Sequence, residues 1–279
     1  FRVCADLGAR MVFPEDKPPF AAAPLVKSGA DLAKLGRPDP SDARTRMADR
    51  VKGVNELARA AGDDCLVLGW VDMPFAEACS LCGVTEFMLM LVDDPPLAHK
   101  VLEFLTGTVV DFALAQLRAG APMIGSGDAA ASLVSPAQYR EFALPYEQRV
   151  TSAVHAAGGL VKLHICGNTS HLMVDMVRSG ADLFNVDHLV DFRAARATYG
   201  KAGVCFKGNL DPGAGMLQST PAACAARCLD CLRQAKGVRY MLSAGCEVPA
   251  ATSDDVFRAF CEAPRHAAEG QGLAGRPSP

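Results

Sequence analysis

Residues 159–187 read GLVKLHICGNTSHLMVDMVRSGADLFNVD and predict one complete strand–helix–strand unit. Two short apolar runs, 159–164 and 182–187, have the length and composition of buried strands, and the stretch between them has a helical pattern. That stretch closes on Gly180, which is typical of a helix C-terminus. A strand, a helix that ends on glycine and a second strand make a βαβ unit, so we expect the two strands to be parallel.

The same pattern repeats along the chain in both directions. Further strands are predicted at 65–70, 122–126, 203–208 and 239–243. Helices are predicted over 43–61, 96–119, 136–157, 169–179, 221–235 and 253–266. Six strands fit either an open doubly wound sheet or most of a (β/α)8 TIM barrel. No Gly-x-Gly-x-x-Gly follows the first strand, so the main signal of a dinucleotide-binding fold is missing.

Polar residues gather at the ends of nearly all these strands, which favours the barrel. They are Asp72, Asp128, His164, Asp187, Asn209, Asp211 and Cys246. In a barrel such strand ends share one rim, where active sites form. Because six strands are two short of eight, we expect an α/β barrel that lacks its first two strands in this chain. The barrel domain is predicted over 1–267, with a surface excursion at 13–42 and a flexible tail at 268–279.

Composition excludes several classes of protein. Half of the 279 residues are hydrophobic, which rules out wholesale disorder. The net charge of −3 (28 basic against 31 acidic residues) argues against a nucleic-acid or anionic-membrane surface. No run approaches the ~20 apolar residues of a membrane span. We therefore expect a cytoplasmic protein whose 11 cysteines are reduced and mostly buried.

The strongest chemical signal is a histidine and a cysteine one residue apart at a strand end. His164 and Cys166 point to the same side of an extended chain, and Cys246 follows the last predicted strand. A His-Cys-Cys set with an open fourth position is an arrangement of catalytic zinc sites. The alternative is a hydrogen-bonded core histidine with two buried cysteines. The two motifs end strands of one barrel, which favours the metal.

Three acidic residues could support such a site. Asp128, Asp187 and Glu247 could each orient His164, serve as a weak fourth ligand or hold substrate. We treat them as candidate catalytic residues.

Three further polar residues have a structural alternative. Asn209 and Asp211 are candidate cofactor-binding residues, although their Asn-Leu-Asp-Pro sequence equally fits a turn. Asp72 precedes a Met-Pro pair and is interpreted as a cap for the next helix.

Two other cysteine patterns are interpreted as packing. Cys224, Cys228 and Cys231 have the spacing of a radical iron–sulfur motif, but they lie in a helical pattern where this spacing defines one apolar stripe. Cys79 and Cys82 fit a helix end that closes on the next glycine, with a redox or zinc role as the alternative.

The segments LHICGN (163–168), FKGNLDP (206–212), LSAGCEVP (242–249) and PAQYREF (136–142) resemble signature segments of the uroporphyrinogen decarboxylase superfamily. Within it they are most similar to the zinc-dependent, corrinoid-linked methyltransferases that act on coenzyme M. The resemblance implies a (β/α)8 barrel and Zn²⁺ held by the residues matching His164, Cys166 and Cys246.

The resemblance also implies a reaction. A methyl group would move from a methylated corrinoid, carried by a corrinoid protein or supplied as free methylcobalamin, to a small thiol such as coenzyme M or to tetrahydrofolate. Two thiolates neutralise Zn²⁺, so a bound substrate thiol stays electron-rich. The alternatives are decarboxylation of uroporphyrinogen, which needs no metal, and a non-catalytic corrinoid- or metal-binding barrel.

Overall fold

The computed structural model describes residues 1–15 and 19–270, which form two compact units. Among the described residues, the first contains those of Phe1–Ile165 and Val174–Asp182, and the second contains Cys166–Met173 and residues 183–270. Of the tail predicted at 268–279, residues 268–270 belong to the last helix, and 271–279 lie outside the described residues.

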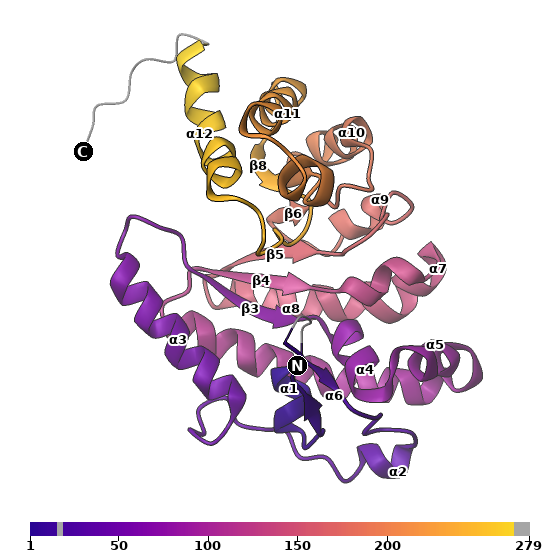
Figure 1. The fold of residues 1–279 in the computed structure, drawn as a ribbon. Helices are drawn as coiled ribbons and strands as arrows, with labels where there is room; N and C mark the ends of the chain where they lie inside the picture. The colour runs from indigo at the N-terminus through magenta and orange to yellow at the C-terminus, as the bar shows by residue number, and fades with distance from the viewer. Residues whose placement is uncertain (16–18, 271–279) are drawn as a thin grey trace. The chain divides into compact units, whose positions relative to one another are not determined.

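The first unit is built on three parallel strands, β3 (Leu68–Asp72), β4 (Met123–Gly127) and β5 (Leu160–His164) (Figure 1). The central strand is β4, whose Gly125 pairs with Trp70 on one side and with Lys162 on the other. All five residues of β4 are buried. A parallel strand that is covered on both faces is expected to be buried along its whole length.

Helices cover these strands and link their ends. They are α1 (Arg2–Asp6), α2 (Gly29–Leu32), α3 (Arg46–Ala61), α4 (Pro74–Cys82), α5 (Val84–Asp93), α6 (Pro95–Arg118), α7 (Pro136–Gln138), α8 (Leu144–Ala156) and α9 (Met173–Val177). The long helix α6 packs against α3, α4, α5, α8 and β3. Helix α3 is capped twice, by Thr45 and by Asp6, whose carboxylate accepts the backbone N–H groups of Arg46 and Met47.

Two glycines of β4 make room for a tryptophan. A Cβ atom on Gly125 would lie 2.7 Å from Cε3 of Trp70, and one on Gly127 would lie 2.9 Å from Cζ2 of the same ring. The Lys162 ammonium lies 4.6 Å from the ring centroid, within cation–π distance. The indole therefore occupies the space that two side chains of β4 would otherwise fill.

The helix predicted over 136–157 is present from 136 to 156 and contains a π-helical turn. Between α7 and α8, Tyr139–Ala143 forms a π-helical turn, and Pro145 lies in the first turn of α8. Proline lacks an N–H group and crowds the carbonyl four residues earlier, so the helix widens just before it. The predicted helix is therefore confirmed, and the π-helical turn is a local widening that its apolar pattern does not indicate.

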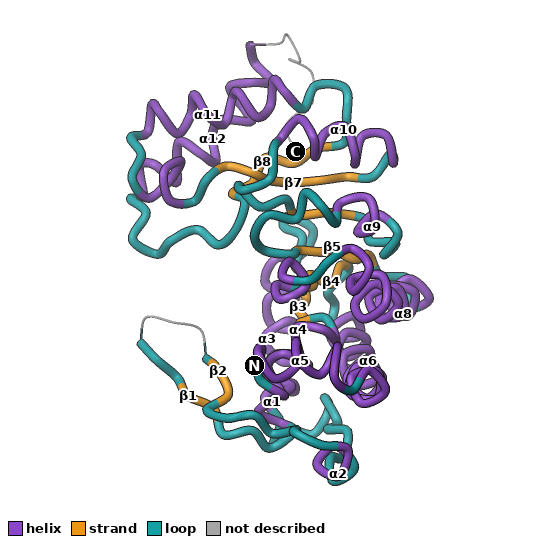
Figure 2. Tube along the Cα trace, turned by 90° about the vertical axis from the view of Figure 1, so that its right-hand side faces the viewer, coloured by secondary structure: helices purple, strands orange, loops and turns teal. Residues whose placement is uncertain are grey.

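The second unit contains the parallel strands β6 (Leu183–Asn185), β7 (Cys205–Leu210) and β8 (Tyr240–Ala244). Its helices are α10 (Phe192–Ala202), α11 (Pro221–Gln234) and α12 (Asp254–Gly270), of which α11 and α12 pack together (Figure 2). Stacked rings fill its core: Tyr199 lies 4.8 Å from Phe184 and 5.8 Å from Phe206 between ring centroids.

The prediction of an α/β fold with six parallel strands is confirmed, and each strand begins within three residues of its predicted start. The packing interpretation is confirmed for Cys79 and Cys82, and also for Cys224 and Cys228, while Cys231 is half-buried.

The excursion predicted at 13–42 contains more order than expected. Strand β2 (Phe20–Ala21) lies there and pairs antiparallel with β1 (Met11–Val12), which ends just before the excursion, and α2 follows. Among the described helices, none alone is long and apolar enough to span a membrane, and only α4 and α5, bent by 107°, meet that measure as a pair.

Candidate metal centre

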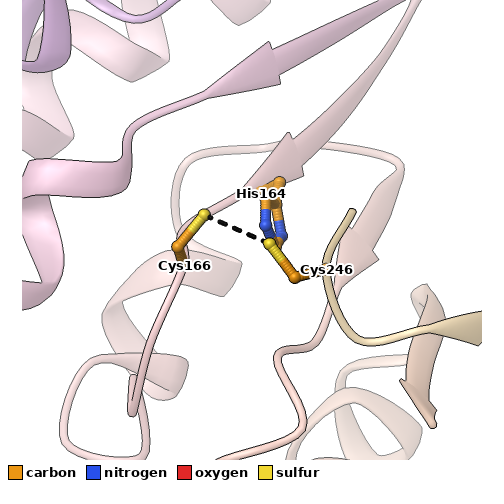
Figure 3. Close-up of side chains that lie close together, drawn as sticks. All are labelled: His164, Cys166 and Cys246. Atoms are coloured by element: carbon orange, nitrogen blue, oxygen red, sulfur yellow. Dashed lines mark hydrogen bonds between the residues drawn. The ribbon is translucent and has the colours of Figure 1, made fainter. Parts of the chain in front are cut away.

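Two strand ends supply the three predicted metal ligands. His164 is the last residue of β5, Cys166 follows it after one residue, and Cys246 lies two residues beyond the end of β8. The ligand atoms of the three side chains all lie within 4.8 Å of one another (Figure 3). Because one residue joins His164 to Cys166, the chain itself keeps the imidazole beside that thiol.

The separation of the two sulfur atoms fits a tetrahedral metal. Sγ of Cys166 lies 3.8 Å from Sγ of Cys246. Two Zn–S bonds of about 2.3 Å at a tetrahedral angle place their sulfur atoms about 3.8 Å apart. A disulfide would require a separation of about 2.05 Å. The donor set of one imidazole and two thiols is also one that zinc selects.

The group is buried on its histidine side and open on its sulfur side. His164 is 8% exposed, whereas both cysteines are only half-buried. Catalytic zinc sites keep one position for water or substrate, and structural sites close all four with protein ligands. The three described ligands and the partial exposure of the thiols match the first kind.

Asp187, predicted to support the site, binds backbone. Its Oδ2 accepts the N–H of Gly167 at 2.9 Å, and its Oδ1 accepts the N–H of Leu189 at 3.0 Å. The side chain is 4% exposed, so these bonds are shielded from water. The bond that links it to the three-ligand group is the one to Gly167, the residue that follows Cys166.

Asn185 was not singled out by sequence, although it precedes Asp187 by two and therefore shares its side of an extended chain. Its Nδ2 donates to the carbonyl of Gly245 at 3.1 Å, immediately before Cys246. Asn209 lies nearby and donates to the carbonyls of Val190 at 2.6 Å and Asp187 at 3.3 Å.

Asp128 lies beneath His164, where its backbone N–H donates to the His164 carbonyl at 2.9 Å. Its Oδ1 accepts the N–H of Ala76 at 2.7 Å. Its Oδ2 and the Oε1 of Glu147 are buried without another hydrogen-bond partner, and Oε2 of Glu147 accepts the Tyr139 hydroxyl at 2.5 Å. A proton on Asp128, donated to Glu147, accounts for both atoms.

Burial is the main cause of the unusual pKa values of this pair. Desolvation raises the pKa of Asp128 well above its usual value, and the neighbouring Glu147 charge raises it further. Desolvation also raises the pKa of Glu147, to about 7, against hydrogen bonds from Tyr139 and Asp128 that lower it. The sequence contains no signal for Glu147, because nothing near it in the chain indicates that this residue of α8 pairs with Asp128 at the end of β4.

The remaining candidates lie outside the three-ligand group. Glu247 is exposed beside Cys246. Asp211 accepts the N–H groups of the residues two and three positions later at 2.8 and 3.1 Å, as in a turn. The interpretation of Asp72 as a helix cap is wrong: the N-cap residue of α4 is Met73, and Asp72 instead accepts the Trp70 indole N–H at 3.2 Å. Asp128 caps α4 through its bond to Ala76.

The sequence profile of the family described as Uroporphyrinogen decarboxylase (URO-D) matches residues 2–267. The chain belongs to the uroporphyrinogen decarboxylase family. Curated relatives agree with this assignment. The chain is 31% identical over 203 residues to "Uroporphyrinogen decarboxylase" from Myxococcus xanthus (strain DK1622), covering 71% of this chain and 57% of the relative. It is 27% identical over 258 residues to the protein of the same name from Prochlorococcus marinus (strain MIT 9211), covering 89% and 71%.

The fold of this family member is that of a solved methyltransferase. A "methyltransferase from Methanosarcina mazei" superposes with a TM-score of 0.85 at 21% identity, over 95% of this chain and 77% of that protein. The prediction of a TIM-barrel-like α/β fold is thereby confirmed. The family is one of enzymes, and the chain spans 57% of the length of its Myxococcus relative.

Proposed function

We propose that this protein is a zinc-dependent methyltransferase that moves a methyl group from a methylated corrinoid to a small thiol such as coenzyme M, with tetrahydrofolate as the alternative acceptor. The observation that carries the proposal is the group of His164, Cys166 and Cys246, with its 3.8 Å sulfur–sulfur separation. The solved methyltransferase from Methanosarcina mazei has the same fold, so in that protein the fold supports methyl transfer.

The three residues suit zinc by number, type and spacing. Zinc at this position would keep a substrate thiol deprotonated and nucleophilic at neutral pH. The protein's part is binding and orientation. Cys166 and Cys246 would contribute two negative charges that offset the metal's, and the buried His164 would fix one side of the site. The half-buried sulfur side leaves access for a substrate thiol.

Asp128 and Glu147 lie beneath this site rather than in it. The pair is fully buried, and one of its backbone groups supports the end of β5 through the His164 carbonyl. Burial raises the pKa values of both carboxyls and so favours their neutral forms. This limits the electrostatic effect that two ionised carboxylates would have on the ligands above them.

Decarboxylation of uroporphyrinogen is the second candidate. Its support is the name that the curated relatives carry at 27–31% identity. Such a reaction has no use for three soft metal ligands brought together at one point. We therefore rank it below methyl transfer.

The test uses the gene product that contains this chain, purified with its metal. We expect about one zinc per protein, and thiol-dependent demethylation of methylcobalamin that is seen as a change in the visible spectrum. Cys246→Ser should lose both zinc and activity, because a site with one thiolate binds the metal poorly. Cys261→Ser is the matched control, since Cys261 is exposed on α12.

Two results would contradict the proposal. One is full zinc occupancy in Cys246→Ser. The other is metal-independent release of carbon dioxide from uroporphyrinogen without methyl transfer to any thiol or folate, which would establish the second candidate instead.

A further inference from the structure

Two side chains on one side of β6 and its continuation reach the backbone beside both candidate thiol ligands. Asp187 accepts the N–H of Gly167, the residue after Cys166, at 2.9 Å. Asn185 donates to the carbonyl of Gly245, the residue before Cys246, at 3.1 Å. One short stretch of chain thus contacts the backbone beside two cysteines that lie 80 residues apart in sequence.

We propose that Asn185 and Asp187, the β6 pair, are positioning residues that hold Cys166 and Cys246 at the separation a tetrahedral metal requires. The inference rests on the proposed function in taking zinc as the metal. It adds the part of the protein that sets the geometry of the thiols before metal arrives.

The surroundings of the β6 pair make its hydrogen bonds rigid. Asn185 and Asp187 are 7% and 4% exposed, so water does not readily replace the bonds they make. Asp187 is itself held at further points. Its Oδ1 accepts the N–H of Leu189 and lies 3.0 Å from Nδ1 of His188, and its carbonyl accepts from Asn209. Ligands held by such outer contacts need little rearrangement on binding metal.

Close backbone packing reinforces the same two segments. A Cβ atom on Gly245 would lie only 2.4 Å from the backbone nitrogen of His188, next to Asp187. The segment that carries Cys246 therefore lies directly against the chain that holds the segment of Cys166. The sulfur–sulfur separation of 3.8 Å is set by this arrangement rather than by two independent loops.

The chemistry of the pair allows each bond to be removed with little change of shape. Asp187→Asn leaves one acceptor oxygen for two backbone N–H groups and turns an amide N–H toward the other. Asn185→Asp replaces the donor that faces the Gly245 carbonyl with an acceptor. Asp191→Asn is the matched control, because Asp191 also accepts a backbone N–H, that of Ala194 at 2.8 Å, but at the start of α10.

The primary measurement is Zn²⁺ affinity by competition with a chelator. We expect a loss of about 10- to 100-fold in Asp187→Asn and in Asn185→Asp, and no loss in Asp191→Asn. The Co²⁺-substituted proteins should show altered absorption in the two pair variants, because that spectrum reports the ligand geometry. Melting in the presence of chelator shows whether each variant still folds. Asn185→Ala and Asp187→Ala serve as second variants if either polar substitution prevents folding.

A double-mutant cycle separates positioning from a general effect on the fold. If Asp187 acts through Cys166, its substitution should cost much less affinity in a Cys166→Ser background than in a Cys246→Ser background. The reverse order should hold for Asn185. The cycles use Cd²⁺, a soft ion that favours thiolate ligands.

The possible results distinguish a failure of the positioning role of the β6 pair from a failure of the proposed function. Equal loss of affinity in both serine backgrounds, or affinity like the wild type in both pair variants, overturns the role of the β6 pair while the metal site stands. A wild-type protein that binds neither Zn²⁺ nor Cd²⁺ overturns the proposed function, and this inference with it.

Discussion

Replacing Gly245 with alanine should weaken metal binding while the protein still folds. A Cβ atom at this position would lie 2.4 Å from the backbone nitrogen of His188 and 3.1 Å from the carbonyl carbon of Asp187, whereas ordinary contact begins at 3.4 Å. Relief requires a movement of about 1 Å. Both obstacles are backbone atoms, so no flexible side chain can give way.

Cys246, the next residue, moves with this segment. Metal–ligand distances tolerate only about 0.2 Å, so a shift of about 1 Å should disturb the 3.8 Å separation of the sulfur atoms well beyond that tolerance. The hydrogen bond from Asn185 to the Gly245 carbonyl stretches as well. We expect Zn²⁺ affinity to fall about 10- to 100-fold, which corresponds to roughly 1.4 to 2.8 kcal/mol.

The assay is chelator competition, paired with thermal melting of the metal-free protein. Gly53→Ala is the control, because Gly53 lies in the exposed part of α3 with nothing within 4 Å of an added Cβ. It should bind Zn²⁺ like the wild type and gain about 0.5–1 kcal/mol of stability from helix propensity. Wild-type affinity in Gly245→Ala would refute the view that backbone contact sets the position of Cys246.

Two other variants test the interior of each unit. Burial raises the pKa of Glu147 to about 7 from 4.5, so the wild type should lose stability as pH rises from about 4.5 to 7. Over that window the unfolding free energy of Glu147→Gln should rise relative to that of the wild type by up to about 3 kcal/mol, as measured by urea titration at each pH. Parallel pH profiles of the two proteins would count against a buried, titrating Glu147. Cys228→Ala should keep its zinc content and lose about 1 kcal/mol of folding stability, since Cys228 is fully buried in an apolar cluster with Leu210 and Met216. Loss of metal on elemental analysis would show that α11 takes part in the site.

The strands were predictable because each is a short apolar run beside glycine or proline. Residues 160–164 are an example, with Gly158 and Gly159 before them and a polar residue at their end. The helix over 136–156 was also predictable, but its π-helical turn before Pro145 was not, because the apolar pattern continues through it. Periodicity records which face a residue occupies, whereas a missing N–H group alters the hydrogen bonds along the axis.

In the site, too, local features were predictable from sequence and long-range contacts were not. His164 and Cys166 were found because their spacing within a strand is a local property. The roles of Asp187 and Asn185 were not, since their partners are backbone groups 20 and 60 residues away. Asp72 was interpreted as a cap because it is near the start of α4 in sequence, but Asp128 reaches that helix from the end of the neighbouring strand.

The indole of Trp70 lies where side chains at positions 125 and 127 would be, with clearances below 3.0 Å from an added Cβ. These three positions therefore cannot drift independently during evolution. A lineage that gains a side chain at 125 or 127 must first shrink the ring at 70, and one that keeps the ring must keep both glycines. In the first case Lys162, whose ammonium lies against the ring, loses the surface that it packs on. Substitutions at these four positions, on three neighbouring strands, are therefore expected to occur together.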